Sequence, residues 1–320
     1  MEEFINKIKD SIGTNQFDDF CLREFYPQME RLEKNRLKKF LQIIITTLAI
    51  IPAVIYAYAI IMTLPPKLAG YCGIAVVIFI SIVLVIYNLT ISDYKSTVKQ
   101  FMLDKLLSYI GDFKQADKET YTNDSIANYV KELKLFKTFN NSSFGDKIVG
   151  NYKGLNIEII ETDLYLKKED NGGKTHTDIF KGILVKVPLT KEIFGDTVVL
   201  KKTDLRPEQD INVNIDNTEF EEYFNVYSND QIEARSLLSK TFTDKIIRLK
   251  RSNLLKNDIS FSFEKGMLNI AIESSKDWFE VPFMKSAKNL KNYRNIILEM
   301  ITILSIVDAL VSDDELTNEE

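Results

Sequence analysis

The chain has 320 residues, of which 45% are hydrophobic and 27% are charged, and its formal net charge is −5. This composition is typical of a folded protein of about two domains and not of a disordered chain. The negative charge argues against a nucleic-acid-binding protein, which needs a broad basic surface to neutralise phosphates. The two cysteines, Cys21 and Cys72, form no CxxC motif, so they indicate a reducing compartment and not a disulfide framework.

The first 39 residues are predicted to form amphipathic helices that lead into a long apolar run. Their opening stretch, MEEFINKIKD, is charged, so we do not expect a cleavable signal peptide. Apolar residues recur at helical intervals up to Ile12, and Gly13 follows as a stop signal. Pro27 is expected to break the next segment, with a new helix starting at Met29.

Two uncharged runs follow, 25 residues over 40–64 and 24 residues over 68–91. Each exceeds the roughly 20 residues that a helix needs to cross a hydrocarbon core. Two buried helices of a soluble core are the alternative, but globular helices rarely stay uncharged over six turns. Only three residues join the runs, so we predict a transmembrane helical hairpin over 40–91.

Basic residues flank the predicted hairpin mainly on the side of the chain ends. Those before the first run are Arg31, Lys34, Arg36, Lys38 and Lys39. Lys95 and Lys99 follow the second run, whereas the connecting loop has Lys67 alone. The positive-inside rule therefore places both termini in the cytoplasm of a two-pass protein of the bacterial inner membrane. Neither run contains Asp, Glu, Lys, Arg or His, which argues against a transporter that works alone.

Residues 92–140 are predicted to form two juxtamembrane helices, the second over 124–137. From residue 141 the pattern changes to strands. The stretches 155–166 and 178–189 flank the turn signal DNGGK, and 258–274 is predicted to be a second hairpin.

Helices are expected between and after these strands, over 229–250 and 287–310. We therefore predict an α+β fold, in which the transmembrane hairpin precedes a cytoplasmic domain (141–310) of mainly antiparallel sheet with flanking helices. About seven strands and a closing helix also describe a pleckstrin-homology-like barrel, an analogy of architecture only. Residues 311–320 are acidic and predicted to be a disordered tail.

Three stretches, 180–200, 216–239 and 259–283, stand in the same order as in a bacterial family catalogued as domain of unknown function 3137. The chain resembles this family most specifically in the middle stretch, with its Asp230-Gln231 pair, although members often have a tyrosine where Ser236 stands. The resemblance implies two membrane spans before the soluble part, a shared fold and no established activity. It also implies a possible partner, because genes of the family often neighbour those of Lem-A-like membrane proteins.

The stretch NVYSNDQIEARSLL, 225–238, gathers polar groups suited to acid–base chemistry. A structural interpretation takes Ser228 as a helix N-cap with Gln231 at N3, and Tyr227 with Ile232 as a hydrophobic staple. We favour this interpretation. The functional alternative is a contact with a ligand or partner, made by four residues: Tyr227, Asn229, Asp230 and Arg235.

The sequence contains no further recognisable catalytic, cofactor or metal motif. Its single histidine, His176, cannot form an HExxH site, and no GxSxG, GxxxxGK[ST] or GxGxxG pattern occurs. We therefore predict no catalytic, cofactor-binding or metal-binding residues and no cofactor.

The favoured function is that of a non-enzymatic membrane protein, embedded in the lipid bilayer, whose cytoplasmic domain is a scaffold or binding module for a partner protein or lipid headgroup. One alternative is a membrane-associated enzyme that uses carboxylates near Asp230 and Glu233. Another is a regulatory subunit of a transporter or channel.

Overall fold

The computed structural model of the protein describes residues 15–116, 122–170, 173–204, 211–251 and 258–311. The helix predicted before Gly13 and the tail predicted after Val311 lie outside these residues. The chain forms two compact units, which do not follow chain order. Within the described residues, the hairpin unit combines 15–105 with Glu280–Asn295, and the sheet unit is built from Leu106–Phe279 and 296–311. The predicted division into five consecutive segments stays a prediction.

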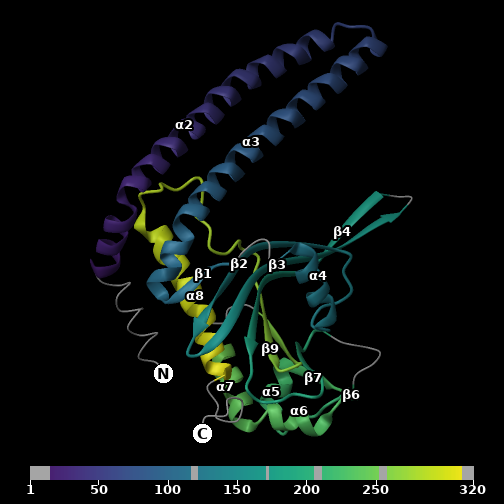
Figure 1. Cartoon of the computed structure of the whole chain (residues 1–320). Helices are drawn as coiled ribbons and strands as arrows, with labels where there is room; N and C mark the ends of the chain where they lie inside the picture. Colours follow the sequence, from purple (N-terminus) through teal and green to yellow (C-terminus); the bar gives the residue numbers. More distant parts are fainter. Residues whose placement is uncertain (1–14, 117–121, 171–172, 205–210, 252–257, 312–320) are drawn as a thin grey trace. The chain divides into compact units, whose positions relative to one another are not determined.

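Two long helices, α2 (Asn15–Ile61) and α3 (Pro66–Ile110), form most of the hairpin unit, and the last residues of α3, from Leu106 on, belong to the sheet unit (Figure 1). Both are long and apolar enough to cross a membrane by length and composition, so the predicted pair of helices is confirmed. The side chains of the uncharged runs point outward, and Leu48, Ile55 and Leu89 are 66%, 64% and 64% exposed. These helices therefore carry an apolar surface that no other described part of the hairpin unit covers.

The predicted helix break at Pro27 is wrong, because α2 runs through both Pro27 and Pro52. A proline in a helix interior removes one hydrogen bond and clashes with the preceding turn, at a cost of about 3 kcal/mol. Phe25 and Met29, on either side of Pro27, are buried. The helix nevertheless continues through position 27, which sequence propensity alone does not reveal.

An ion pair joins α2 and α3 where the uncharged runs end. Lys39, the last charged residue before the first run, pairs with Asp93, which follows the second run. The Lys39 Nζ also lies 3.5 Å from the carbonyl oxygen of Thr90. Within the runs, the Tyr87 hydroxyl lies 3.1 Å from the Thr47 Oγ1. The two runs therefore end at the same level of the helix pair.

The segment 280–289, which we call the strap, packs against both helices just below this level. The Glu33 carboxylate accepts the Ala287 backbone N–H at 2.7 Å and pairs with Arg36 at 2.7 Å. Arg36 in turn donates to the Phe283 carbonyl oxygen at 3.3 Å. Because Glu33 and Arg36 have side chains only 12% and 10% exposed, this polar lock is largely shielded from water.

Aromatic contacts fix the strap from its other side. The Phe283 ring packs edge-on against Tyr94 of α3, with ring centroids 5.3 Å apart, and lies 6.3 Å from the Phe40 ring of α2. Glu280 pairs with Lys95 of α3 at 2.5 Å. The strap is thus wedged between the two helices by apolar, polar and charged contacts.

We expect Glu33→Gln to lower the free energy of unfolding of the hairpin unit by about 2 kcal/mol at neutral pH. The reason is that Arg36 loses its charged partner in a poorly hydrated site. The hydrogen bond from Arg36 lowers the pKa of Glu33 below its usual 4.5, and the Ala287 amide acts in the same direction. A depressed folded-state pKa means that the contribution is present above pH 4.5 and is lost as pH falls through the folded-state value.

The measurement is thermal unfolding of the detergent-solubilised protein and of the variant between pH 7 and pH 3. The difference in midpoint is expected to shrink below pH 4.5. An equal difference at every pH would show that the Glu33 charge does not hold the strap.

The sheet unit is built on one antiparallel sheet whose nine described strands have the order β1-β2-β3-β4-β9-β8-β5-β7-β6 (Figure 1). The strands are β1 (Asp112–Gln115), β2 (Asn141–Tyr152), β3 (Leu155–Asp170), β4 (Gly173–Pro188), β5 (Thr197–Lys201), β6 (Ile211–Asn212), β7 (Phe224–Ser228), β8 (Ile259–Glu264) and β9 (Met267–Glu273). The helices are α4 (Asn123–Glu132), α5 (Thr218–Tyr223), α6 (Gln231–Leu237), α7 (Lys240–Arg251) and α8 (Leu290–Val311), whose first residues belong to the hairpin unit.

Helices cover both faces of this sheet. On one face, Ile126 and Val130 of α4 join a core cluster that includes Leu184 and Val198. On the other face, the Phe242 ring of α7 packs 5.9 Å from Phe261 and 5.7 Å from Phe263 of β8. Successive strand residues point to opposite faces, so the apolar alternation places one core on each side.

The predicted α+β fold with antiparallel sheet is confirmed, and both predicted hairpins are present as β3–β4 and β8–β9. The predicted helix over 229–250 is two helices, α6 and α7, separated near Leu238. The sheet differs from the pleckstrin-homology-like barrel expected by analogy, because β1 and β6 are separate ends of one nine-stranded order in the described residues.

Gly182 tests the close pairing of β4 and β9. A Cβ at this position would lie 2.0 Å from the Ile272 carbonyl oxygen, a backbone atom that cannot move without parting the strands. We expect Gly182→Ala to destabilise the sheet unit by about 3 kcal/mol. This corresponds to a fall of roughly 6–12 °C in the thermal unfolding midpoint.

Gly111→Ala is the matched control, since a Cβ there meets nothing closer than 3.8 Å. The control is expected to change the midpoint by less than about 2 °C. Equal midpoints for the two variants would contradict the observed register of β4 against β9.

Candidate binding corner

The turn from β7 into α6 holds the polar stretch that the sequence singled out. Asp230 is the N-cap of α6, and its Oδ1 accepts the backbone N–H groups of Ile232 at 2.9 Å and Glu233 at 3.0 Å. The predicted N-cap at Ser228 is therefore wrong by two positions. Ser228 ends β7 instead, and its buried Oγ accepts the Asp230 N–H at 3.0 Å.

This shift also removes the predicted hydrophobic staple. With Asp230 as the N-cap, Asn229 takes the N′ position and Ala234 takes N4. Tyr227 is buried in the core cluster below α4, whereas Ile232 is 83% exposed. The two side chains that were expected to pack together therefore lie in different environments.

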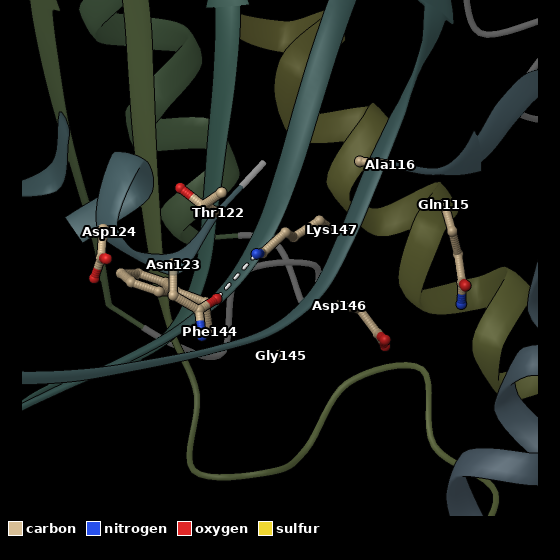
Figure 2. Close-up of a pocket in the computed structure, with 9 residues that line it drawn as sticks. All are labelled: Gln115, Ala116, Thr122, Asn123, Asp124, Phe144, Gly145, Asp146 and Lys147. Atoms are coloured by element: carbon tan, nitrogen blue, oxygen red, sulfur yellow. Dashed lines mark hydrogen bonds between the residues drawn. The ribbon is translucent and has the colours of Figure 1, made fainter. Parts of the chain in front are cut away.

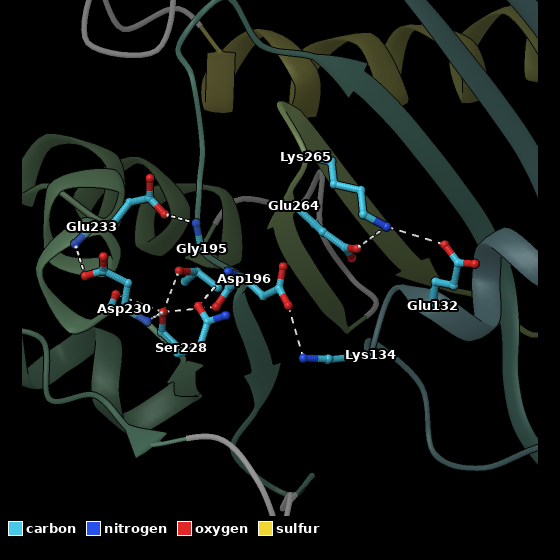
Figure 3. Close-up of polar contacts among 11 residues, drawn as sticks. Glu132, Lys134, Gly195, Asp196, Ser228, Asp230, Glu233, Glu264 and Lys265 are labelled. Carbon is cyan, nitrogen blue, oxygen red and sulfur yellow. Dashed lines mark hydrogen bonds and ion pairs between the residues drawn. The ribbon is translucent and has the colours of Figure 1, made fainter.

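Side chains at the start of α6 form hydrogen bonds with the backbone of the loop that precedes β5 (Figure 3). The Glu233 carboxylate accepts two adjacent backbone N–H groups, from Phe194 at 3.0 Å and Gly195 at 2.7 Å. The Asn229 Oδ1 accepts the next one, from Asp196, at 2.8 Å. Three successive backbone donors of the loop are thus fixed by two side chains, and we call residues 193–196 and 228–233 the corner.

Gly195 is required for this close approach. A Cβ at position 195 would lie 2.8 Å from both the Asn229 Oδ1 and the Glu233 Oε2. A further ion pair holds the corner from the end of α4, because the Lys134 Nζ lies 3.1 Å from the Asp196 Oδ2. Figure 3 shows these contacts beside the Lys265 pairs with Glu132 and Glu264.

The corner displays two large apolar side chains. Phe194 is 85% exposed and Ile232 is 83% exposed, the highest values for large hydrophobic residues in the described part of the chain. Both residues belong to the corner, because the Phe194 backbone N–H donates to the side chain of Glu233, the residue after Ile232. The local hydrogen bonds therefore hold two exposed apolar groups on a rigid frame.

The four residues predicted as partner contacts take different places. Tyr227 is buried, Asn229 binds the loop backbone and Asp230 caps α6. Arg235 is exposed, and its Nε donates to the Asn214 carbonyl oxygen at 3.4 Å. The sequence did not single out Phe194, although a phenylalanine in the charged loop KEIFGD, 191–196, is a usable signal.

An open pocket of about 560 Å³ lies elsewhere in the sheet unit (Figure 2). It is formed by the end of β1, the start of α4 and an irregularity in β2 around Gly145. The Lys147 Nζ donates to the Asn123 Oδ1 across it at 3.0 Å, and Thr122 caps α4. Its lining is mainly polar, with Ala116 and Phe144 as apolar members, and no histidine or cysteine lies among these residues.

The described residues do not bring together a metal or nucleophile site. They contain no group of three or more His, Cys, Asp or Glu residues that could hold a metal ion. His176 is exposed on β4, stacks on Tyr165 with ring centroids 4.6 Å apart, and lies 2.7 Å from Asp178. Burial, with a smaller effect of Asp18, raises the pKa of the Cys21 thiol to about 12, which keeps it protonated at neutral pH.

The protein thus consists of an α+β domain joined to two long apolar helices, and the corner of this domain exposes the apolar side chains of Phe194 and Ile232. Residues 178–311 match the family described as "Protein of unknown function (DUF3137)", which confirms the resemblance seen in the sequence. The match extends from within β4 to the end of α8.

Among solved structures, the crystal structure of the mycobacterial trehalose monomycolate transport factor A, TtfA, is similar over 65% of this chain and 95% of that chain. The sequence identity is 8% and the TM-score is 0.32. No curated protein matches the chain in sequence.

Asp230 provides a test of the corner's construction. We expect Asp230→Ala to lower the stability of the sheet unit by about 1 kcal/mol, because two backbone N–H groups lose their acceptor. The thermal midpoint should fall by roughly 2–4 °C. Asp230→Asn should retain most of the stability, because asparagine caps helices about as well as aspartate.

Gln231→Ala serves as the control, since this side chain does not act as the cap. A loss with Asp230→Asn as large as that with Asp230→Ala would show that the charge, and not the cap, is what matters at this position.

Proposed function

We propose that this chain is a two-pass protein of the bacterial inner membrane, with both termini in the cytoplasm. Its sheet unit is a binding module for a partner protein, and the corner is the contact surface. The length and apolar surface of α2 and α3 support the membrane anchor. The excess of basic residues on the side of the chain ends supports the orientation.

The exposure of Phe194 and Ile232 carries the proposal of a partner protein. Burial of each side chain would contribute roughly 1.5–3 kcal/mol to association. Because Glu233 and Asn229 already hold the loop, little ordering would be needed when a partner binds, which favours affinity. A rigid aromatic anchor beside an aliphatic one is typical of the energetic centre of a protein interface.

A partner protein fits this corner better than a lipid headgroup does. Carboxylates lie within two residues of these apolar side chains in sequence, including Asp230, Glu233 and the exposed Glu192. These charges would repel an anionic headgroup. The family resemblance suggests a Lem-A-like membrane protein as a candidate partner, and such a partner would also accommodate a role as a regulatory subunit of a transporter or channel.

The enzyme alternative, based on Asp230 and Glu233, has less support. Each carboxylate accepts two backbone N–H groups, Asp230 within α6 and Glu233 from the 193–196 loop. General acid–base catalysis needs a carboxyl group that can exchange protons with a substrate. Both groups are instead committed to holding the backbone.

The test is affinity purification in a gentle detergent of the protein and of the double variant Phe194→Ser/Ile232→Ser. We expect the amount of a specific co-purified membrane protein to fall more than about tenfold, because loss of two buried anchors removes several kcal/mol. The thermal midpoint should change by less than about 2 °C, since both positions are exposed.

Leu298→Ser is the matched control, because Leu298 is a large hydrophobic residue of α8 that is 43% exposed. This variant should retain the partner. A partner that is retained equally by all three proteins would refute the corner as the contact surface.

A further inference from the structure

The strap and the start of α8 have an unusual charge pattern. From Val281 to Leu298 the chain contains no aspartate or glutamate. It contains three lysines at intervals of three residues, Lys285, Lys288 and Lys291, and all three are exposed. A segment with this composition is suited to binding an anionic membrane surface.

Contacts within the hairpin unit place the strap at the end of the apolar runs. Phe283 packs beside Phe40, the first residue of the uncharged run in α2, and against Tyr94 of α3. The Lys39–Asp93 pair marks the same level on the two helices. If the runs cross a bilayer, this level is its cytoplasmic interface.

The apolar residues of the strap point in two directions. Phe283 is buried between the helices, whereas the next residue, Met284, is 72% exposed. A flexible, unbranched thioether side chain suits the boundary between headgroups and acyl chains. The exposed methionine and the three lysines therefore form an amphipathic surface beside the helices.

The neighbouring charges add to this surface. The exposed residues Arg31 and Lys38 lie on α2 just before the uncharged run, as does Lys34, which is paired with Glu30 at 3.4 Å. The strap-side carboxylates are already neutralised, because Glu33 is paired with Arg36 and Glu280 with Lys95. The cytoplasmic end of the hairpin unit thus has an excess of positive charge.

We propose that the strap is a third membrane contact of this protein, in addition to the two apolar helices. Lys285, Lys288 and Lys291 bind the headgroups of anionic phospholipids, and Met284 enters the interfacial layer. This inference rests on the proposed membrane insertion of α2 and α3. It gives the segment that precedes α8 a specific lipid preference, although hydropathy does not mark it as a membrane segment.

The position of Met284 is tested in the full-length protein with the native Cys72 replaced by serine. A Met284→Cys variant is labelled with an environment-sensitive fluorophore and reconstituted into phosphatidylcholine vesicles with or without phosphatidylglycerol. The control label is placed by Ser236→Cys, at an exposed position on α6.

A headgroup-attached quencher should reduce the emission at 284 roughly threefold more than the emission at 236, because interfacial segments lie about 5–10 Å deep. The effect should be stronger with phosphatidylglycerol. Equal quenching at the two positions in both kinds of vesicle would overturn the inference.

The charge requirement is tested with the triple variant Lys285→Gln/Lys288→Gln/Lys291→Gln. The ratio of phosphatidylglycerol to phosphatidylcholine retained through purification from mixed bilayers should fall on the order of tenfold or more, since each surface lysine contributes about 1 kcal/mol. The control is the triple variant of three exposed cations of the sheet unit, Lys131→Gln, Lys240→Gln and Arg248→Gln.

An unchanged lipid ratio in the strap variant, or an equal fall in the control, would overturn the headgroup assignment. Alkaline carbonate extraction of native membranes separates this failure from that of the proposed function. A protein that carbonate releases is not inserted, and both proposals fail. A protein that resists release but shows no strap effect leaves the anchor intact and refutes the strap contact alone.

Discussion

The apolar surface of the helical hairpin is the constraint on which the other features of this protein depend. Residues such as Leu48, Ile55 and Tyr56 of α2, and Val77 of α3, are more than 60% exposed. Each large apolar side chain left in water forgoes roughly 1.5–3 kcal/mol. Over two helices of this length the sum is larger than the whole stability of an ordinary domain. A hydrocarbon surrounding would remove this cost, which supports the proposed membrane insertion and would restrict where charges can be placed.

The charges follow this constraint closely. Lys39 and Asp93 pair where the uncharged runs stop, and the strap with its lysines lies directly below them. The strap, which is distant from α2 and α3 in sequence, thereby packs against both helices where the uncharged runs end. The Glu33 carboxylate fixes the position of the strap on α2, because it accepts the Ala287 backbone N–H. A similar contact occurs in the corner of the sheet unit, where Glu233 accepts two backbone N–H groups of the loop that precedes β5.

Much of the fold could be predicted from sequence because its signals are local. Uncharged runs, strand alternation and the Lys265-Gly266 turn each reside in a few consecutive residues, and the structure contains the corresponding elements. The N-cap of α6 could not be assigned in this way. Ser228 with Gln231 and Asp230 with Glu233 both satisfy the capping pattern, and only the β7 register decides between them.

The candidate sites were harder to predict because they depend on distant contacts. The exposure of Phe194 arises from its partner Glu233, 39 residues later. The strap is positioned by Arg36, 247 residues before its acceptor at Phe283. Single-sequence patterns contain no information on such pairings. Likewise, α2 continues through Pro27 despite the local tendency of proline to end a helix.

Thiol accessibility in intact cells tests the central claim, membrane insertion of the hairpin with both chain ends inside, most directly. With Cys72 replaced by serine, Lys67→Cys in the connecting turn is compared with Ser236→Cys in the sheet unit. A membrane-impermeant maleimide applied to spheroplasts should label position 67, and position 236 should react only after the membrane is opened. Labelling of both positions before opening, or of position 236 alone, would contradict the account.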